Sequence, residues 1–90
     1  MSKKVLLIED DLQMQKFIIE YLKDYDFDCT AFDQPKDALE EFKKENDYCI
    51  IILDLMLPEM DGFDLFKKLK QINDIPIIIS SARGDIGNKI

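Results

Sequence analysis

Histidine is absent from this 90-residue chain, and cysteine occurs only at Cys29 and Cys49. Zinc sites are built mostly from histidine and closely spaced cysteine ligands, so this composition excludes one. The two cysteines fall in two different predicted strands, on either side of a third. Their thiols would then lie about two strand spacings apart, roughly 9–10 Å, which is too far for a disulfide. We expect two buried, unreactive thiols.

Long apolar runs are also missing. A membrane-spanning helix needs a stretch of about 18 or more apolar residues, and no part of the chain comes near that length. Residues 1–4 lead into a strand-like run without a signal-peptide cleavage pattern. We therefore expect a cytoplasmic protein that makes no membrane contact.

Positive charge is in deficit, because 12 Lys and Arg residues stand against 19 Asp and Glu residues and the net charge is −7. Such a segment repels nucleic-acid phosphates, so we expect no nucleic-acid partner for it. An acidic surface suits a metal ion or a protein partner better. The hydrophobic fraction of 47% is typical of a folded chain, and residues 1–90 are expected to form one small domain.

The chain is organised around residues 49–62, where five apolar residues run into Asp54 and then into a turn with Pro58. An unbroken apolar run of this length predicts a central parallel strand that is buried on both faces. Asp54 would lie at the carboxyl end of that strand, the edge where open α/β sheets bind ligands. The alternative is that Asp54 only caps a loop.

The other segments alternate between strand and helix patterns. Residues 5–8 form a second apolar run that ends in Glu9, Asp10 and Asp11. A helix is expected next, with Gln15 on its polar face and its apolar stripe at Met14, Phe17, Ile18, Tyr21, Leu22 and Tyr25. A strand is expected over 27–32, and then a helix that has Pro35 in its first turn and buries Ala38, Leu39 and Phe42. The last two expected elements are a helix with Phe63, Phe66 and Leu69 and a strand over 75–81.

This order predicts right-handed crossovers and an open parallel sheet with helices on both faces, a three-layer α/β/α architecture. The carboxyl ends of the strands then bring polar groups to one edge of the sheet. These groups are Glu9 and Asp10 after the first strand, Asp54 after the third and Ser81 after the fourth.

Clustered carboxylates repel one another unless a cation or protons neutralise them. All-oxygen ligands with room for water and a phosphate oxygen favour Mg²⁺. With the metal bound, Asp54 can act as a nucleophile toward a phosphoryl group, and the Ser81 hydroxyl can donate to a phosphoryl oxygen. The simpler alternative for residues 9–11 is acidic capping of the following helix.

Three motifs now carry a resemblance: VLLIEDD at residues 5–11, DLMLPEMDG at 54–62 and IIISSAR at 77–83. The whole chain resembles the phosphoacceptor receiver domain of two-component response regulators. The amino-acid sequences of these motifs are most similar to those of the OmpR/PhoB subfamily. The resemblance implies a flavodoxin-like, CheY-like sheet of order 2-1-3-4, with a fifth strand-helix unit missing.

The resemblance implies that Asp54 receives its phosphoryl group from the phosphohistidine of a sensor histidine kinase. It implies that Asp10, Asp54 and the backbone carbonyl of Met56 ligate Mg²⁺, while Glu9 helps through water. The chain would not be an enzyme in the ordinary sense, beyond catalysing its own phosphorylation and dephosphorylation.

The switch hydroxyl of the family falls on Ser81, or on Ser80 if the register is shifted by one, and Asp11 is expected to be a helix cap. The OmpR/PhoB resemblance implies transcription regulation through a DNA-binding domain that is not in this segment. Partners are then the kinase and a second copy in a homodimer.

The chain departs from the family after Ser81. The family has a fifth strand and helix there, and a lysine that pairs with the phosphoryl group. Lys89 is too close to Ser81 in the sequence to be that lysine. We therefore expect an incomplete receiver whose fourth strand, with Ile77, Ile78 and Ile79, has an open edge. Such an edge recruits another strand, so we expect self-association.

Three alternatives remain open. A phosphatase of the haloacid dehalogenase type would have a second Asp two residues after Asp54, where this chain has Met56. A flavin or nucleotide module would have a Gly-, Ser- or Thr-rich loop in place of residues 9–11. An interaction-only receiver would keep the fold without phosphorylation, and the intact Glu9, Asp10 and Asp54 argue against it.

Overall fold

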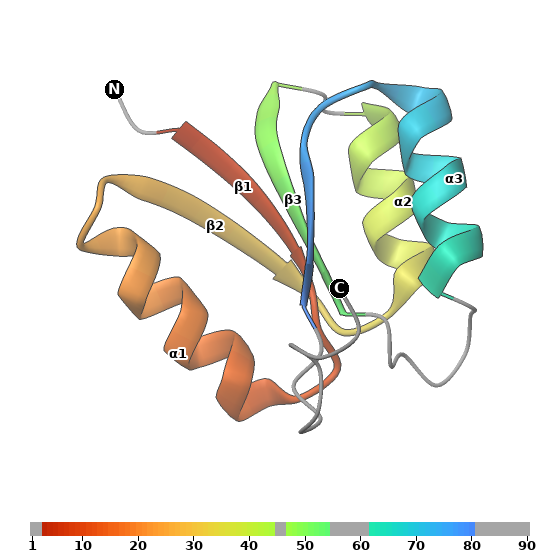
Figure 1. Cartoon of the computed structure of the whole chain (residues 1–90). Coiled ribbons are helices and arrows are strands. Elements are labelled where there is room, and N and C mark those ends of the chain that lie inside the picture. The colour runs from red at the N-terminus through yellow and green to blue at the C-terminus, as the bar shows by residue number, and fades with distance from the viewer. Residues whose placement is uncertain (1–2, 45–46, 55–61, 81–90) are drawn as a thin grey trace.

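The computed structural model of the chain describes residues 3–44, 47–54 and 62–80. Strands and helices alternate along these ranges (Figure 1). In chain order they are β1 (Lys3–Ile8), α1 (Leu12–Lys23), β2 (Phe27–Phe32), α2 (Pro35–Lys44), β3 (Tyr48–Asp54), α3 (Gly62–Ile72) and β4 (Ile77–Ser80). No helix among the described residues is long and apolar enough to cross a membrane.

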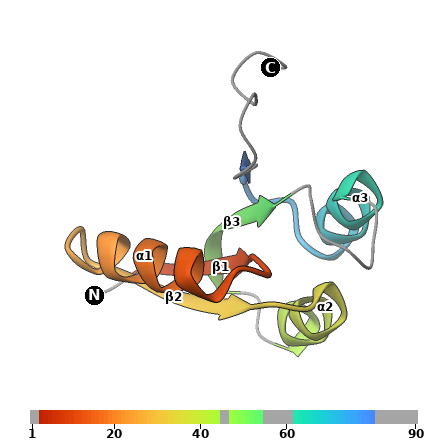
Figure 2. The same ribbon diagram turned by 90° about the horizontal axis from the view of Figure 1, so that it is seen from below.

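The strands form a parallel sheet in the order β2-β1-β3-β4, which confirms the predicted order. Helices α2 and α3 lie on one face of the sheet and α1 on the other (Figure 2). Both strands with continuous apolar runs, β1 and β3, are central, as predicted. The predicted three-layer α/β/α architecture is therefore confirmed. β1 is buried from Val5 to Ile8, whereas Ile50 and Ile52 of β3 are only half-buried, so the expectation that the strand before Asp54 is buried on both faces is wrong: α1 packs chiefly on β2 and leaves that face of β3 partly open.

The main core fills the space between the sheet and the α2 and α3 helices. Phe42 of α2 is fully buried, and its ring centroid lies 6.3 Å from that of Tyr48 on β3. The other buried members of this cluster come from both central strands and both helices: Leu6, Ile8, Ala38, Ile51, Leu53, Leu65 and Leu69. This core fixes β1 against β3 and so fixes the relative positions of their carboxyl ends.

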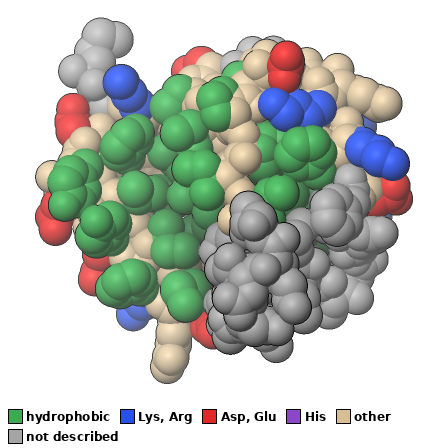
Figure 3. Space-filling view, in the orientation of Figure 1, with side chains coloured by type: hydrophobic (Ala, Val, Ile, Leu, Met, Phe, Trp, Pro, Cys, Tyr) green, Lys and Arg blue, Asp and Glu red, His purple; other side chains and the backbone are tan. Residues whose placement is uncertain are grey.

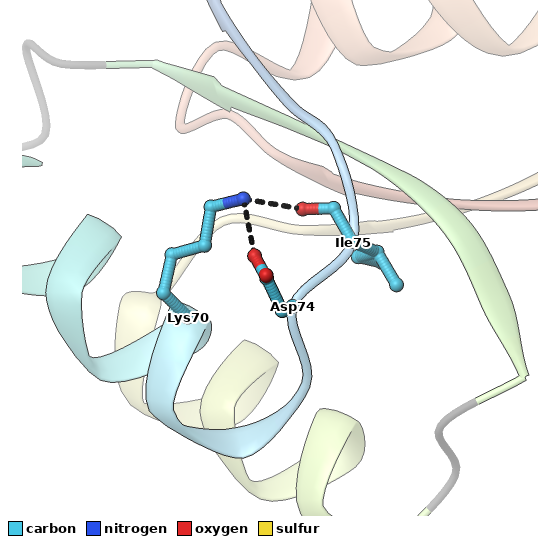
Figure 4. A network of polar contacts seen from close by, with 3 residues as sticks. All are labelled: Lys70, Asp74 and Ile75. Atoms are coloured by element: carbon cyan, nitrogen blue, oxygen red, sulfur yellow. Dashed lines mark hydrogen bonds and ion pairs between the residues drawn. The ribbon is translucent and has the colours of Figure 1, made fainter.

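The connection from α3 to β4 is held by Lys70 (Figure 4). Its Nζ lies 2.9 Å from Asp74 Oδ1 and donates to the backbone carbonyl of Ile75, also at 2.9 Å. The ion pair itself contributes little because Asp74 is exposed. The bond to the Ile75 carbonyl matters more, since it satisfies a backbone acceptor where the chain turns into β4.

The apolar stripe predicted for α1 is only half correct. Met14, Ile18 and Leu22 are half-buried, whereas Phe17 and Tyr21 are 65% and 54% exposed. The exposed aromatic row, completed by Tyr25, runs along the helix with ring centroids 6.3 and 5.2 Å apart. It lies about 60° around the helix axis from the half-buried row. Since α1 packs chiefly on β2, that contact is too narrow to cover both rows.

The cysteines are free and lie on opposite sides of β1, as predicted. Cys29 stands opposite Val5, and Cys49 falls where the pairing of β1 with β3 shifts register between Lys4 and Val5. Both cysteines are only half-buried, so the expectation of buried thiols is wrong. Burial nevertheless raises the pKa of Cys29 to about 11, which keeps it protonated at neutral pH.

Hydrophobic side chains gather on the face that carries α1 and the outer edge of β4 (Figure 3). Ile78 and Ile79 of β4 are 50% and 37% exposed. No other strand among the described residues pairs with the outer edge of β4. An uncharged edge strand of this kind presents open backbone donors and acceptors to another chain.

We therefore predict that the 90-residue chain self-associates in solution. Sedimentation velocity should show a species heavier than the 10.6 kDa monomer whose proportion grows with concentration. Ile78→Lys places a charge on the exposed edge and should shift the chain back to monomer without unfolding it. A wild-type chain that stays monomeric at every concentration would contradict the prediction.

Candidate functional site

The candidate site lies where β1 and β3 end side by side. The register pairs Ile8 with Leu53, so Glu9 and Asp54 follow at neighbouring positions of the sheet edge. Carboxylate oxygens of Glu9, Asp10 and Asp54 lie within 4.8 Å of one another. Glu9 is 3% exposed and Asp54 is 2% exposed, which is rare for acidic residues. The sequence predicted this convergence of the three residues.

The loop from β1 to α1 is fixed by hydrogen bonds at both ends. The Glu9 backbone N–H donates to the Phe32 carbonyl on β2 at 2.9 Å, and the Asp11 N–H donates to Glu9 Oε2 at 3.1 Å. Asp11 Oδ1 accepts from the backbone N–H groups of Gln13, at 2.9 Å, and Met14, at 3.3 Å. Asp11 is therefore the N-cap of α1, as expected, and its Oδ1 is occupied by the backbone of the helix.

Gln15 is a residue of the site that the sequence did not predict. The helical spacing predicts it on the polar face of α1, but its side chain is half-buried and its Nε2 donates to the backbone carbonyl of Glu9. Its position four residues after the helix cap was the available signal, because that spacing returns a side chain to the face of the cap.

The environment of Glu9 keeps a proton at the site near neutral pH. The pKa of Glu9 is raised from 4.5 to about 7, chiefly by burial, and the N–H of Asp11 offsets only part of that rise. The charge of Asp54 and the hydrogen bonds that Glu9 shares with Asp54 and Asp10 supply the rest of the rise. A bound cation would reverse this balance and favour the ionised form.

The three residues fit a divalent cation that prefers oxygen ligands. Asp10 Oδ1 is buried and accepts no hydrogen bond from the described residues. A buried carboxylate oxygen without a donor is costly unless a cation satisfies it. All donors in the cluster are carboxylate oxygens, the ligand type that Mg²⁺, Ca²⁺ and Mn²⁺ prefer. The cluster can therefore hold a metal ion.

The predicted contribution of β4 is only partly visible. Ser80 is paired with Asp54 in the register of β3 and β4, so the end of β4 lies beside Asp54. Ser81 and Met56 lie outside the described residues. Their roles as switch hydroxyl and carbonyl ligand stay predictions.

Comparison with known proteins places these features in a family. Residues 5–90 match the response regulator receiver domain. The transcriptional regulatory protein SrrA of Staphylococcus aureus is 34% identical over 90 residues, which is all of this chain and 37% of that protein. The chain therefore spans little more than a third of that curated relative.

Solved structures agree with the sheet order. The signal receiver domain of a Luxo repressor protein from Vibrio parahaemolyticus is 31% identical with a TM-score of 0.79, over 97% of this chain and 67% of that one. The chemotaxis protein CheY4 of Vibrio cholerae is 23% identical with a TM-score of 0.83, over 99% of this chain and 76% of that one, and shows the same fold.

We predict that the stability of the metal-free domain falls as the pH rises. The folded pKa of Glu9 lies above the unfolded value, so the stabilisation from its proton is complete below about pH 4.5 and is lost as the pH passes through about 7. Glu9→Gln removes this titration. Urea unfolding in EDTA at pH 5 and pH 8 should show a smaller loss of unfolding free energy in Glu9→Gln than in wild type.

Glu20→Gln, on the exposed face of α1, is the matched control and should follow wild type. Equal pH dependence in Glu9→Gln and wild type would show that Glu9 does not hold the proton.

Proposed function

Because the chain belongs to the response regulator receiver domain family of two-component systems, we propose that Asp54 accepts a phosphoryl group and that Glu9, Asp10 and Asp54 hold the Mg²⁺ ion this transfer requires. One observation carries the proposal: three carboxylates from two neighbouring strand ends meet within 4.8 Å, and two of them are almost fully buried. A receiver domain is not an enzyme in the ordinary sense, so the proposed reaction is the phosphorylation of its own Asp54.

Asp54 occupies the position suited to a nucleophile. Its strand, β3, lies between β1, which supplies Glu9 and Asp10, and β4, which ends beside it at Ser80. A carboxylate oxygen of Asp54 would attack the phosphorus atom of a phosphohistidine, forming an O–P bond as the N–P bond breaks. The electron pair of that bond returns to the imidazole nitrogen of the donor. The product is an aspartyl phosphate.

The other two carboxylates would prepare the site for this transfer. Mg²⁺, when bound, supplies positive charge that neutralises the phosphoryl oxygens. Glu9 and Asp10 hold that charge beside Asp54, and the low exposure of the cluster strengthens the attraction by excluding water. The hydroxyl of Ser81 and the carbonyl of Met56 would complete the site, as the family resemblance implies.

A sensor histidine kinase is the proposed phosphoryl donor. The response regulator TrrA, solved in complex with the histidine kinase ThkA, shares the fold at 23% identity and a TM-score of 0.79. Next to the carboxylates, the first turns of α1 carry a shallow groove lined by Leu12, Gln13, Gln15, Lys16 and Ile19. Leu12 is 66% exposed and directly follows the cap Asp11, so a docking partner would find an apolar contact beside the site.

Transcription regulation is the proposed output, because the relative SrrA is a transcriptional regulatory protein. DNA contact would reside outside this segment, whose net charge of −7 repels phosphates. The cytoplasmic location stays a prediction. The interaction-only alternative is less favourable, since a receiver that is never phosphorylated has no need for three mutually repelling carboxylates.

We predict that Asp54→Asn abolishes phosphorylation. Wild type, incubated with acetyl phosphate and Mg²⁺, should gain the mass of one phosphoryl group, measured by intact-mass spectrometry. Asp28→Asn removes an exposed carboxylate on β2 and should retain the full label. An undiminished label in Asp54→Asn would contradict the assignment.

We also predict that Mg²⁺ stabilises the fold, because the ion relieves carboxylate repulsion and binds only the native state. At 100 times its dissociation constant the gain in unfolding free energy should be about 2.7 kcal/mol. Asp10→Ala should lose this gain while raising the stability of the metal-free domain.

Asp37→Ala, on the exposed surface of α2, should keep the Mg²⁺ gain. Urea unfolding with Mg²⁺ and with EDTA measures both quantities. An equal gain in wild type and Asp10→Ala would remove the metal from this edge.

A further inference from the structure

The short segment between β1 and α1 carries two of the three carboxylates, and its backbone is held from two sides. The N–H of Glu9 donates to the Phe32 carbonyl on β2. The carbonyl of Glu9 accepts from Nε2 of Gln15 on α1. Because a carbonyl oxygen only accepts, the amide nitrogen of Gln15 must face it. The two peptide groups that flank the Glu9 Cα atom are therefore tied to two different elements.

The bond from Gln15 bears directly on Asp10. The Glu9 carbonyl and the Asp10 N–H belong to one planar peptide group, so holding the carbonyl holds the plane from which Asp10 projects. Oδ1 of Asp10 is buried and accepts no hydrogen bond from the described residues. The position of this oxygen therefore depends mainly on the backbone of Asp10, because no hydrogen bond from the described residues holds the oxygen itself.

Repulsion among the carboxylates acts against this arrangement. Oxygens of like charge within 4.8 Å favour an opened loop that moves Asp10 outward. A cation that binds an opened site must first bring the ligands back together, and that cost reduces its affinity. A loop held closed before the cation arrives avoids the cost.

We propose that Gln15 is a positioning residue for the metal site: its side-chain amide fixes the Glu9–Asp10 peptide group so that Asp10 meets Glu9 and Asp54 before a cation binds. The inference rests on the proposed function, since it concerns the same cluster. Residues that orient metal ligands typically change affinity by about 10-fold to 100-fold when they are replaced. Gln15 acts through the backbone carbonyl of a ligand, so we expect the lower end of that range.

The positioning role has a signature in ion preference. Mg²⁺ requires near-ideal octahedral geometry at short distances, whereas Ca²⁺ accepts flexible geometry and longer bonds. Loosening the loop should therefore weaken Mg²⁺ binding more than Ca²⁺ binding. A role limited to holding α1 in place would reduce binding of both ions equally and would lower the stability of the metal-free domain.

The test uses Gln15→Met, which keeps the length and helix propensity of the side chain but removes the donor. Gln13→Met makes the same change on an exposed side chain of the same helix turn. Isothermal titration of the 90-residue chain with Mg²⁺ alone and with Ca²⁺ alone gives the dissociation constants. We expect Gln15→Met to weaken Mg²⁺ about 10-fold and Ca²⁺ less than about 3-fold, with Gln13→Met equal to wild type.

Three results would overturn the inference: equal Mg²⁺ affinity in Gln15→Met and wild type, an equal loss in Gln13→Met, or equal losses for both ions accompanied by reduced stability in EDTA. In each of these cases wild type still binds Mg²⁺ and the proposed function stands. If wild type binds no Mg²⁺, the proposed metal site fails and the role of Gln15 fails with it.

Discussion

Mutual repulsion among Glu9, Asp10 and Asp54 is the constraint on which the proposed function depends. Three carboxylates within 4.8 Å of one another, two of them almost fully buried, raise the free energy of the metal-free domain. The protein answers in part by keeping a proton on Glu9, whose pKa rises to about 7. The repulsion that this proton does not relieve favours the binding of a cation, and the bound cation would then attract a phosphoryl group.

The rest of the structure keeps these charges together. The core around Phe42 and Tyr48 fixes the two central strands in register, so their carboxyl ends cannot separate. The register of β3 with β4 brings the end of a third strand beside Asp54. The linker from β1 to α1 is held by the Asp11 cap and by Gln15. The packing of the core thus keeps the three carboxylates together at the edge of the sheet in spite of their repulsion.

The fold and the carboxylate cluster could be predicted because both depend on local patterns. Apolar runs ending at Ile8 and Leu53 identify buried parallel strands, and sheet topology then brings the following acids together. The division of the α1 stripe could not be predicted, since helical periodicity does not say how wide a neighbouring contact is. The role of Gln15 was not predicted because its spacing of four residues from the cap Asp11 indicates only a shared face of the helix, and not that its Nε2 reaches the Glu9 carbonyl.

The proposed site requires a cation between Asp10 and Asp54, and paramagnetic relaxation tests this most directly. Mn²⁺, which shares the oxygen preference of Mg²⁺, is added in trace amounts to ¹⁵N-labelled protein, and amide signals are recorded. We predict that the signals of Asp10 and Asp54 broaden first and that excess Mg²⁺ restores them. Broadening that is spread over the exposed acids of α1 and α2, with Asp54 unaffected, would contradict the account.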